Sequence, residues 1–440
     1  MSAVPVESGA DDFPLPQTQT DQLKPSRARI DSIDLLRGIV MVIMMLDHTR
    51  DFVHYVQLQG FDPTDLEHTS LKIFFTRWIT HFCAPIFVFL AGTSAYLQFA
   101  RGKSKSQLSR FLVTRGFWLI VLELTLVRWG AFFDFDYRFL GAFQVIWVIG
   151  VSMIVLAALI HLPLRLIAAF GILMIAFHNL LDRFHVAGWQ GPQSAVPSYW
   201  AKLFIILHQG FEAFPIFGRR SPVMFVLYPL IPWVGVMAAG YAFGALYQID
   251  AERRQRILLK LGGTATLLFF VIRGINLYGD PSRWSTQKSF SFTVISFLNV
   301  TKYPPFLLFL LMTLGPAMIL LAWFERTAAR SSGSNEGLWS GFTLRLRNAF
   351  ITFGRVPLFF YLLQWPTAHL MSVLVHFIAG KPIGWMFGGQ VDFSPPPAGS
   401  GFNLAVVYVC WIVGVLLLYP LCKWFAGVKQ RRRDWWLSYL

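Results

Sequence analysis

Residues 34–54 read DLLRGIVMVIMMLDHTRDFVH, an apolar run with ionisable residues at both ends. The stretch from Gly38 to Leu46 carries no charge, and a run of this kind predicts a membrane-embedded helix over residues 33–56. Arg37 and His48 are eleven positions apart. At about 100° per residue, this spacing places both side chains on one face of the helix, about 16 Å apart along its axis.

The composition of the whole chain is that of a membrane protein. Of its 440 residues, 55% are hydrophobic and 16% aromatic, and the mean hydropathy is +0.52. Only 14% are charged, against about 25% in soluble domains. These values exclude a soluble enzyme, a disordered protein and a secreted disulfide scaffold. The three cysteines all lie in apolar stretches and are expected to be small buried side chains.

Apolar stretches of about 20 residues predict an all-α, polytopic helical bundle with about ten transmembrane helices. The predicted spans are residues 33–56, 73–99, 111–133, 140–160, 163–181, 222–247, 259–278, 303–324, 349–378 and 402–426. Two segments between spans, 182–221 and 279–302, are unusually long and contain amphipathic stretches. We expect both to lie at the outer membrane interface, where they would cap an outward-facing cavity.

The distribution of basic residues predicts the orientation. Ten spans place both termini on one side, and the segments on that side hold 23 of the Lys and Arg residues, against 10 on the other. This bias predicts cytoplasmic termini in a multi-pass protein of the cell inner (plasma) membrane. It also accounts for the net charge of +15 without a nucleic-acid partner. Residues 1–29 are expected to be a disordered cytoplasmic tail, and residues 427–440 a basic and aromatic one.

Several ionisable or polar residues fall inside predicted spans. Because a charged group in hydrocarbon costs about 2.5–3.5 kcal/mol on insertion scales, such residues usually face a cavity or a partner. Helix positions place six of them in the outer half of the bundle: His48, His81, Glu123, Gln144, Arg273 and Gln364. A layer of this kind predicts a hydrated, outward-facing site. The alternative is a set of hydrogen bonds between helices, with no site.

His48 is the strongest catalytic candidate. An imidazole beside the carboxylates of Asp47 and Asp51 is suited to general-base chemistry. Asp51, three residues further along the helix, has the better spacing to orient the ring. The chain has no signature of a serine hydrolase, a zinc protease or a nucleotide-binding loop, and no closed set of metal ligands, so no metal is predicted.

Arginines gather at the predicted cytoplasmic ends of the spans. They are Arg37, Arg110, Arg115 and Arg355. Planar guanidinium groups bind phosphates in a bidentate manner, so this cluster predicts a site for an anionic cytosolic cofactor. The alternative is that they are arginines of the positive-inside pattern, which extend to the interface.

At these residues the chain resembles the transmembrane acyltransferases. Arg29–Gly38 is similar to the opening of the heparan-α-glucosaminide N-acetyltransferase family, and the Arg37–His48 spacing resembles the Arg-x10-His motif of the acyltransferase-3 family. Further similar stretches are His81–Gly92, Thr114–Gly116 and Gly354–Tyr361. The resemblance extends over residues 29–440 and is closest to bacterial members of the first family.

The resemblance implies that residues 30–426 form a transmembrane acyltransferase domain. This domain would take acyl-CoA from the cytoplasm and acylate an acceptor on the other face of the membrane. Arg37, with Arg115 and Arg355, would lie at the CoA end, and His48 at the thioester end. In the glucosaminide enzyme the position of His48 is not histidine, and the active histidine precedes the second helix. There this chain has His68, a few residues out of register. His48 is therefore the first candidate for the active histidine and His68 the second.

The predicted function is transfer of an acyl group, with acetyl from acetyl-CoA as the first choice, to an extracytoplasmic amino sugar or other glycan. His81 and Glu123 join the predicted catalytic set through their depth in the bundle. A secondary transporter or proton-coupled permease is the alternative, since buried histidines, carboxylates and proline-broken helices are also typical of transporters. A non-catalytic membrane scaffold is the third hypothesis. Transfer to oxygen or to nitrogen, and the oligomeric state, are left open.

Overall fold

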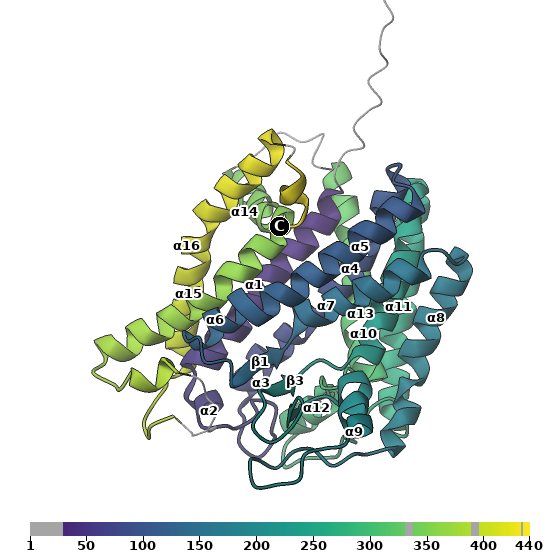
Figure 1. Cartoon of the computed structure of the whole chain (residues 1–440). Helices are drawn as coiled ribbons and strands as arrows, with labels where there is room; N and C mark the ends of the chain where they lie inside the picture. The colour runs from purple at the N-terminus through teal and green to yellow at the C-terminus, as the bar shows by residue number, and fades with distance from the viewer. Residues whose placement is uncertain (1–29, 331–337, 389–395, 433) are drawn as a thin grey trace, which may run out of the picture. The chain divides into compact units, whose positions relative to one another are not determined.

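Apolar helices make up most of the protein (Figure 1). The computed structural model describes residues 30–330, 338–388, 396–432 and 434–440. The predicted tail at residues 1–29 lies outside the described residues. Among those described, seven helices are long and apolar enough to cross a membrane. The prediction of an all-α, membrane-spanning bundle is therefore confirmed, and the protein is a multi-pass membrane protein.

Five sets of neighbouring helices form the bundle. The first surrounds α1 (Asp31–Val53), which packs against α14 (Leu338–Arg355), α15 (Pro357–Ile378) and α16 (Leu404–Arg431). The others are α4 (Cys83–Ala100) with α10 (Leu230–Phe243), α5 (Lys105–Leu122) with α7 (Val145–Leu159), α8 (Leu164–Phe177) with α10, and α11 (Ala251–Ile275) with α13 (Leu307–Arg330). Each of the ten predicted spans overlaps at least one of these helices. The bundle thus keeps the helix order expected from the apolar runs.

Several long helices are interrupted or extended by short turns. The short helical elements are α2 (Tyr55–Leu58), α3 (Leu71–Trp78), η1 (Ile79–Phe82), η2 (Glu123–Val127), α6 (Arg128–Phe132), η3 (His178–Arg183), α9 (Tyr199–Phe204), η4 (Ile205–Gln209), η5 (Gly244–Gln248), α12 (Phe290–Leu298), η6 (Gly384–Met386) and η7 (Trp435–Ser438). The elements η2 and η4 are π-helical, a conformation that is frequent at functional sites. The predicted amphipathic stretches of the outer segments contain α9 and α12.

Three predicted span boundaries are wrong. The span at 349–378 is two helices, because Val356 precedes Pro357 and a residue before proline is pushed out of the helical region. The spans at 140–160 and 222–247 begin as strands, β1 (Phe139–Phe143) and β3 (Val223–Val226). Their backbones pair with each other, so these residues are not available to a helix.

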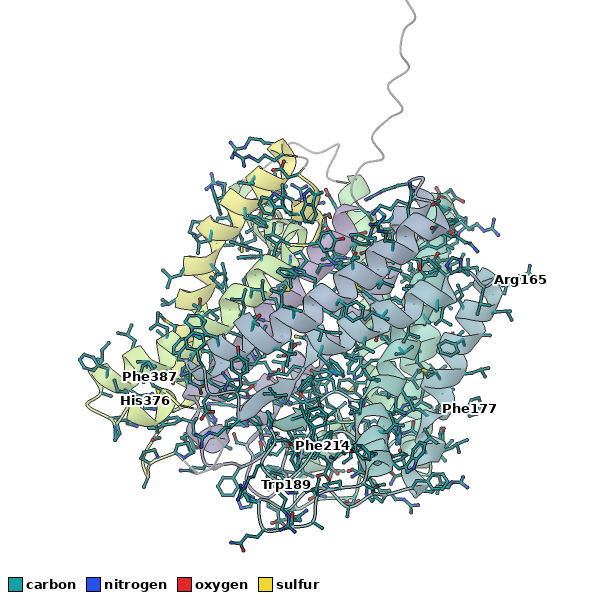
Figure 2. All side chains as sticks on the ribbon, viewed as in Figure 1. Arg165, Phe177, Trp189, Phe214, His376 and Phe387 are labelled. Atoms are coloured by element: carbon teal, nitrogen blue, oxygen red, sulfur yellow. The ribbon has the colours of Figure 1, made fainter. Side chains whose placement is uncertain are left out.

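One small sheet lies among the loops at one end of the bundle (Figure 1). Its strand order is β1-β3-β2, with β2 at Glu212–Pro215; β1 is parallel to β3, and β2 is antiparallel to it. Phe214 packs there with Ile205 and Val226 in a small apolar core, with Trp189 against it, and Figure 2 labels Phe214 and Trp189 at this end. The segment at residues 182–221 therefore packs against β3.

Two glycines allow α1 and α14 to touch along their backbones. A Cβ atom built on Gly38 would lie 1.7 Å from the carbonyl oxygen of Phe350, and one on Gly354 would lie 1.8 Å from that of Asp34. No side chain fits at either position without separating the helices. This contact fixes the position of Arg37, which lies next to Gly38.

Candidate active site

His48 lines a cavity of about 280 Å³, which we call the His48 cavity. Its deeper wall includes Met44, one turn before His48 on α1, together with Cys83 and Ala84. Its mouth is formed by loop residues from several parts of the chain, among them Phe61, Phe211 and Tyr303. The cavity therefore reaches from the loop end of the bundle into its interior, where His48 lies.

The ring of His48 is held by an aromatic contact. It packs against Trp365 of α15, with ring centroids 3.9 Å apart and planes tilted by 38°. Its Nδ1 lies 4.0 Å from Oδ2 of Asp51, which is too long for a hydrogen bond. Neither ring nitrogen has a hydrogen-bond partner among the described residues. His48 is thus a buried imidazole in a cavity wall, and the described residues leave the hydrogen-bonding capacity of both nitrogens unused.

Asp47 is the centre of a cluster of cations. Arg77 donates to both carboxylate oxygens at 2.7 Å, and Thr80 donates to Oδ1 at 2.9 Å. Arg50 lies 2.8 Å from Oδ1, and Nζ of Lys302 lies 3.8 Å from Oδ2. Because all these groups are mostly buried, the carboxylate is needed to offset the burial of the positive charges. Asp47 therefore connects α1 to α3 and to the loop before α13.

Asp51 lies at the solvent side of the same wall. Its side chain is 37% exposed, and its Oδ1 accepts a hydrogen bond of 2.6 Å from Arg50. Its second oxygen faces His48 at the 4.0 Å given above. A small movement of either side chain would bring Asp51 and His48 into hydrogen-bond contact. The geometry fits the predicted orienting role of Asp51 better than a role for Asp47.

His68, the second candidate, lies on a loop outside the predicted spans. Its Nδ1 is 2.6 Å from Oδ2 of Asp65, and this hydrogen bond lowers the pKa of Asp65. Its ring stacks on Phe61, with centroids 4.6 Å apart, and Phe61 lines the His48 cavity. The side chain of His68 is 48% exposed. His68 is therefore an oriented histidine near the mouth, separated from the cavity by one aromatic ring.

His81 and Glu123 are not among the described residues that line the cavity. His81 is 2% exposed and meets the ring of Phe309 edge to face, with centroids 5.5 Å apart. Glu123 accepts a hydrogen bond of 3.1 Å from the backbone N–H of Trp147, in the first turn of α7. A carboxylate there stabilises the unpaired N–H groups of a helix N-terminus. The geometry gives Glu123 a capping role.

A second cavity, of about 470 Å³, adjoins the first, and we call it the aromatic cavity. Both are lined by Asp51, Gln57, Gly60, Gln144 and Trp365. Its wall also contains His369, whose ring lies between Phe133 and Phe52 in parallel stacks, with centroids 4.1 and 4.8 Å apart. Phe133 also stacks on Phe387, which Figure 2 labels beside His376 where α15 ends. Trp365 is thus one of the residues that line both the His48 cavity and the aromatic cavity.

The predicted inner arginines are already engaged by the protein. Arg37 donates to Ser94 at 2.9 Å, and also to Asp34 and the carbonyl of Gly354 at 3.3 and 3.4 Å. Arg115 donates to the carbonyl of Ser438, in the C-terminal turn η7. Arg355 lies 3.7 Å from Asp31 and keeps 30% of its side chain exposed. None of these arginines is among the described residues lining the His48 cavity.

Two important wall residues, Trp365 and Lys302, are absent from the predicted site. Trp365 follows Gln364, the residue that sequence position placed in the polar layer, and Lys302 lies in a predicted outer segment. In the sequence, the position of Trp365 between Gln364 and Pro366 is only a weak indication that it belongs to the site. Their proximity to His48 depends on how α15 and the loop before α13 pack on α1. Among the described residues, no three His, Cys, Asp or Glu side chains gather as a metal site would require.

Comparison with known proteins gives the family. The family described as "Heparan-alpha-glucosaminide N-acetyltransferase, catalytic" matches residues 29–282, which is more than half of the chain. The match covers α1, the His48 end of the cavity wall and His68, and it ends before α12. No curated protein matches the chain. The protein is a membrane acetyltransferase-type protein, and it belongs to the heparan-alpha-glucosaminide N-acetyltransferase catalytic family.

Proposed function

We propose that the protein transfers an acetyl group from cytosolic acetyl-CoA to an amino sugar or another glycan unit on the extracytoplasmic side, with His48 as general base. The observation that carries this proposal is the position of His48. It is a buried imidazole with two unpartnered nitrogens, in the wall of a cavity that opens among the loops. A base must be within hydrogen-bond reach of the proton that it removes, and a cavity wall provides that access.

The reaction then needs one proton carrier. The acceptor's hydroxyl or amine attacks the thioester carbonyl carbon, so that a C–O or C–N bond forms and the C–S bond breaks. His48 takes the proton from the acceptor and returns it to the CoA sulfur, so the ring ends the cycle in its starting form. Asp51, 4.0 Å from Nδ1, would stabilise the imidazolium between the two proton transfers. Trp365 would hold the ring in position through their stacked contact.

The donor's route is the less direct part of the proposal. Arg37 and His48 are on the same helix, α1, and the cavity wall extends one turn inward from His48 to Met44. An extended pantetheine arm between the two ends of α1 would place the thioester at His48 and the phosphates near Arg37, Arg115 and Arg355. The side chain of Arg355 is 30% exposed and that of Arg37 is 15% exposed, so Arg355 is the more accessible of these two guanidinium groups.

A thermal-shift experiment tests the proposed function. The purified protein in lipid nanodiscs is melted alone, with CoA, with acetyl-CoA, and with ATP as an anionic control. Because a ligand that binds only the folded state raises the melting temperature, CoA and acetyl-CoA should both stabilise the protein, and ATP should not. Equal shifts with all three would indicate nonspecific anion binding, and no shift with acetyl-CoA would contradict the proposed donor.

A further inference from the structure

Three basic side chains, Arg50, Arg77 and Lys302, are among the described residues that line the His48 cavity. Two of its three carboxylates are fully engaged: Asp47 accepts from Arg77 and Thr80 and pairs with Arg50, and Asp62 accepts from the backbone and hydroxyl of Thr64. The third, Asp51, accepts from Arg50 through Oδ1, and its Oδ2 faces His48. In contrast, Nε and Nη1 of Arg50 have no partner among the described residues, although Arg50 is only 1% exposed. Buried donors of this kind normally find an acceptor, so the cavity is incomplete without one.

Lys302 is a second basic side chain of this wall whose donors are not fully used. Its side chain is 7% exposed, and it lines the cavity. Its nearest carboxylate oxygen is Oδ2 of Asp47, at 3.8 Å, which is outside hydrogen-bond distance and already accepts from Arg77. The ammonium also lies 5.1 Å from the ring centroid of Tyr303. An ammonium carries three donors and is costly to bury without acceptors, so Lys302 can donate to oxygen atoms of water or of a bound molecule in the cavity.

We propose that the His48 cavity contains an anion subsite in which Lys302, with the unpartnered edge of Arg50, binds a carboxylate or phosphate of the acceptor. The inference rests on the proposed function, because the same molecule would present its hydroxyl or amine to His48. Charge-assisted hydrogen bonds to such oxygens are stronger than neutral ones and fix the ligand's orientation. The acceptor class is therefore a small acidic unit, such as a uronic acid or a sugar phosphate.

The size of the cavity limits this ligand. Small-molecule pockets usually measure about 300–1,000 Å³, and the His48 cavity, at about 280 Å³, is just below that range. One sugar-sized unit fits this description better than a longer chain. Further units of a larger acceptor would extend into the adjoining aromatic cavity, across the wall that Trp365 forms.

Binding measurements test the subsite without any acyl transfer. The full-length protein in nanodiscs is titrated with glucuronate, glucose 6-phosphate and the neutral methyl glucoside, for the wild type and for Lys302→Met, Lys302→Arg and Lys72→Met. Lys72 is an exposed lysine in the first turn of α3 and does not line the cavity, so its variant controls for the loss of one positive charge. The two acidic ligands distinguish a carboxylate site from a phosphate site.

At least one acidic ligand should bind the wild type and Lys72→Met, and methyl glucoside should bind neither measurably. Lys302→Met should weaken that binding about tenfold or more, because hydrogen bonds to charged groups are worth about 1.5–3 kcal/mol, and Lys302→Arg should restore most of it. Equal binding of neutral and acidic ligands, or unchanged binding in Lys302→Met, would overturn the subsite. The melting-temperature shift with acetyl-CoA, measured on the same samples, tests the proposed donor separately. If acetyl-CoA causes no shift in the wild type, acyl transfer is contradicted, and the binding data for the Lys302 variants still decide whether the anion subsite exists.

Discussion

The imidazole of His48 and the indole of Trp365 pack with their centroids 3.9 Å apart, and both side chains line the His48 cavity. Trp365 comes from α15, whereas His48 comes from α1, and these helices are in direct contact. Trp365 also lines the aromatic cavity on its other side. The tryptophan is therefore placed both to orient the proposed base and to separate the two cavities.

A substitution at Trp365 tests this positioning role. Trp365→Leu should lower the acetyl-transfer rate per folded molecule about tenfold, because the ring of His48 loses its stacking partner. Trp365→Phe keeps an aromatic face and should restore most of the rate. Trp411→Phe on α16 is the control: Trp411 is a partly buried tryptophan that also contacts α1, through a hydrogen bond from its Nε1 to the carbonyl of Val42, but it lies outside both cavity walls. Equal rates in the leucine and phenylalanine variants would show that aromatic stacking does not matter.

Asp47 gives a prediction about stability. Asp47→Asn leaves Arg77, Arg50 and Lys302 without their shared carboxylate, so the free energy of unfolding should fall by about 3–5 kcal/mol, the range for breaking a buried ion pair. Asp51→Asn, at a side chain that is 37% exposed, should cost much less. Melting temperatures of both variants in nanodiscs provide the comparison. Similar melting temperatures for the two variants would contradict the central place of Asp47 in the cluster.

Arg37 tests the cytoplasmic end of the proposed route. Arg37→Lys should weaken CoA binding, because a point charge does not reproduce the planar guanidinium. Arg256→Lys is the control: it lies on the same predicted face, on α11, in an exposed pair with Glu252. Since Arg37 also donates to Ser94, the melting temperature without ligand must be measured alongside. Unchanged CoA affinity in a folded Arg37→Lys protein would remove Arg37 from the donor site.

The predicted orientation is tested by cysteine labelling. In a cysteine-free background, an impermeant reagent added outside intact cells should label Gln190→Cys, in a predicted outer loop, and should not label Ser106→Cys. Both positions are exposed in the structure, and Ser106 lies in the first turn of α5, so neither change removes a buried contact. Labelling of Ser106→Cys from outside would invert the orientation and place His48 in the cytoplasmic half.

The sequence predicts the helices well and the site in part. The apolar runs locate the helices, because a span in lipid must satisfy its own backbone hydrogen bonds. The Arg37–His48 face also follows from helix geometry within one element. The break at Val356 was predictable from Pro357. The strands β1 and β3 were not, because their pairing joins segments about 80 residues apart in apolar sequence that also suits a helix.

The contacts of the site depend on packing between elements. Depth along each helix placed His81 and Glu123 in the polar layer, but depth does not give the direction in which a side chain points. Glu123 instead caps α7, and His81 packs on Phe309. Lys302 and Trp365 reach the cavity from a loop and from α15. No local spacing encodes such contacts, so they required the folded structure.

The most direct test of His48 as the catalytic base compares the two candidate histidines. Acetyl transfer from acetyl-CoA to glucosamine 6-phosphate, which carries both the amine and an acidic group, is measured per folded molecule in nanodiscs. The proteins compared are the wild type, His48→Gln and His68→Gln, with folded protein quantified by gel filtration and melting. Because a positioned base contributes about 10²–10⁴ in rate, His48→Gln should lose activity by at least about a hundredfold, with a near-normal melting temperature. His68→Gln, at the exposed loop, should keep most of its activity. The opposite pattern, near-normal activity in His48→Gln with loss in His68→Gln, would contradict the assignment of His48 as the base.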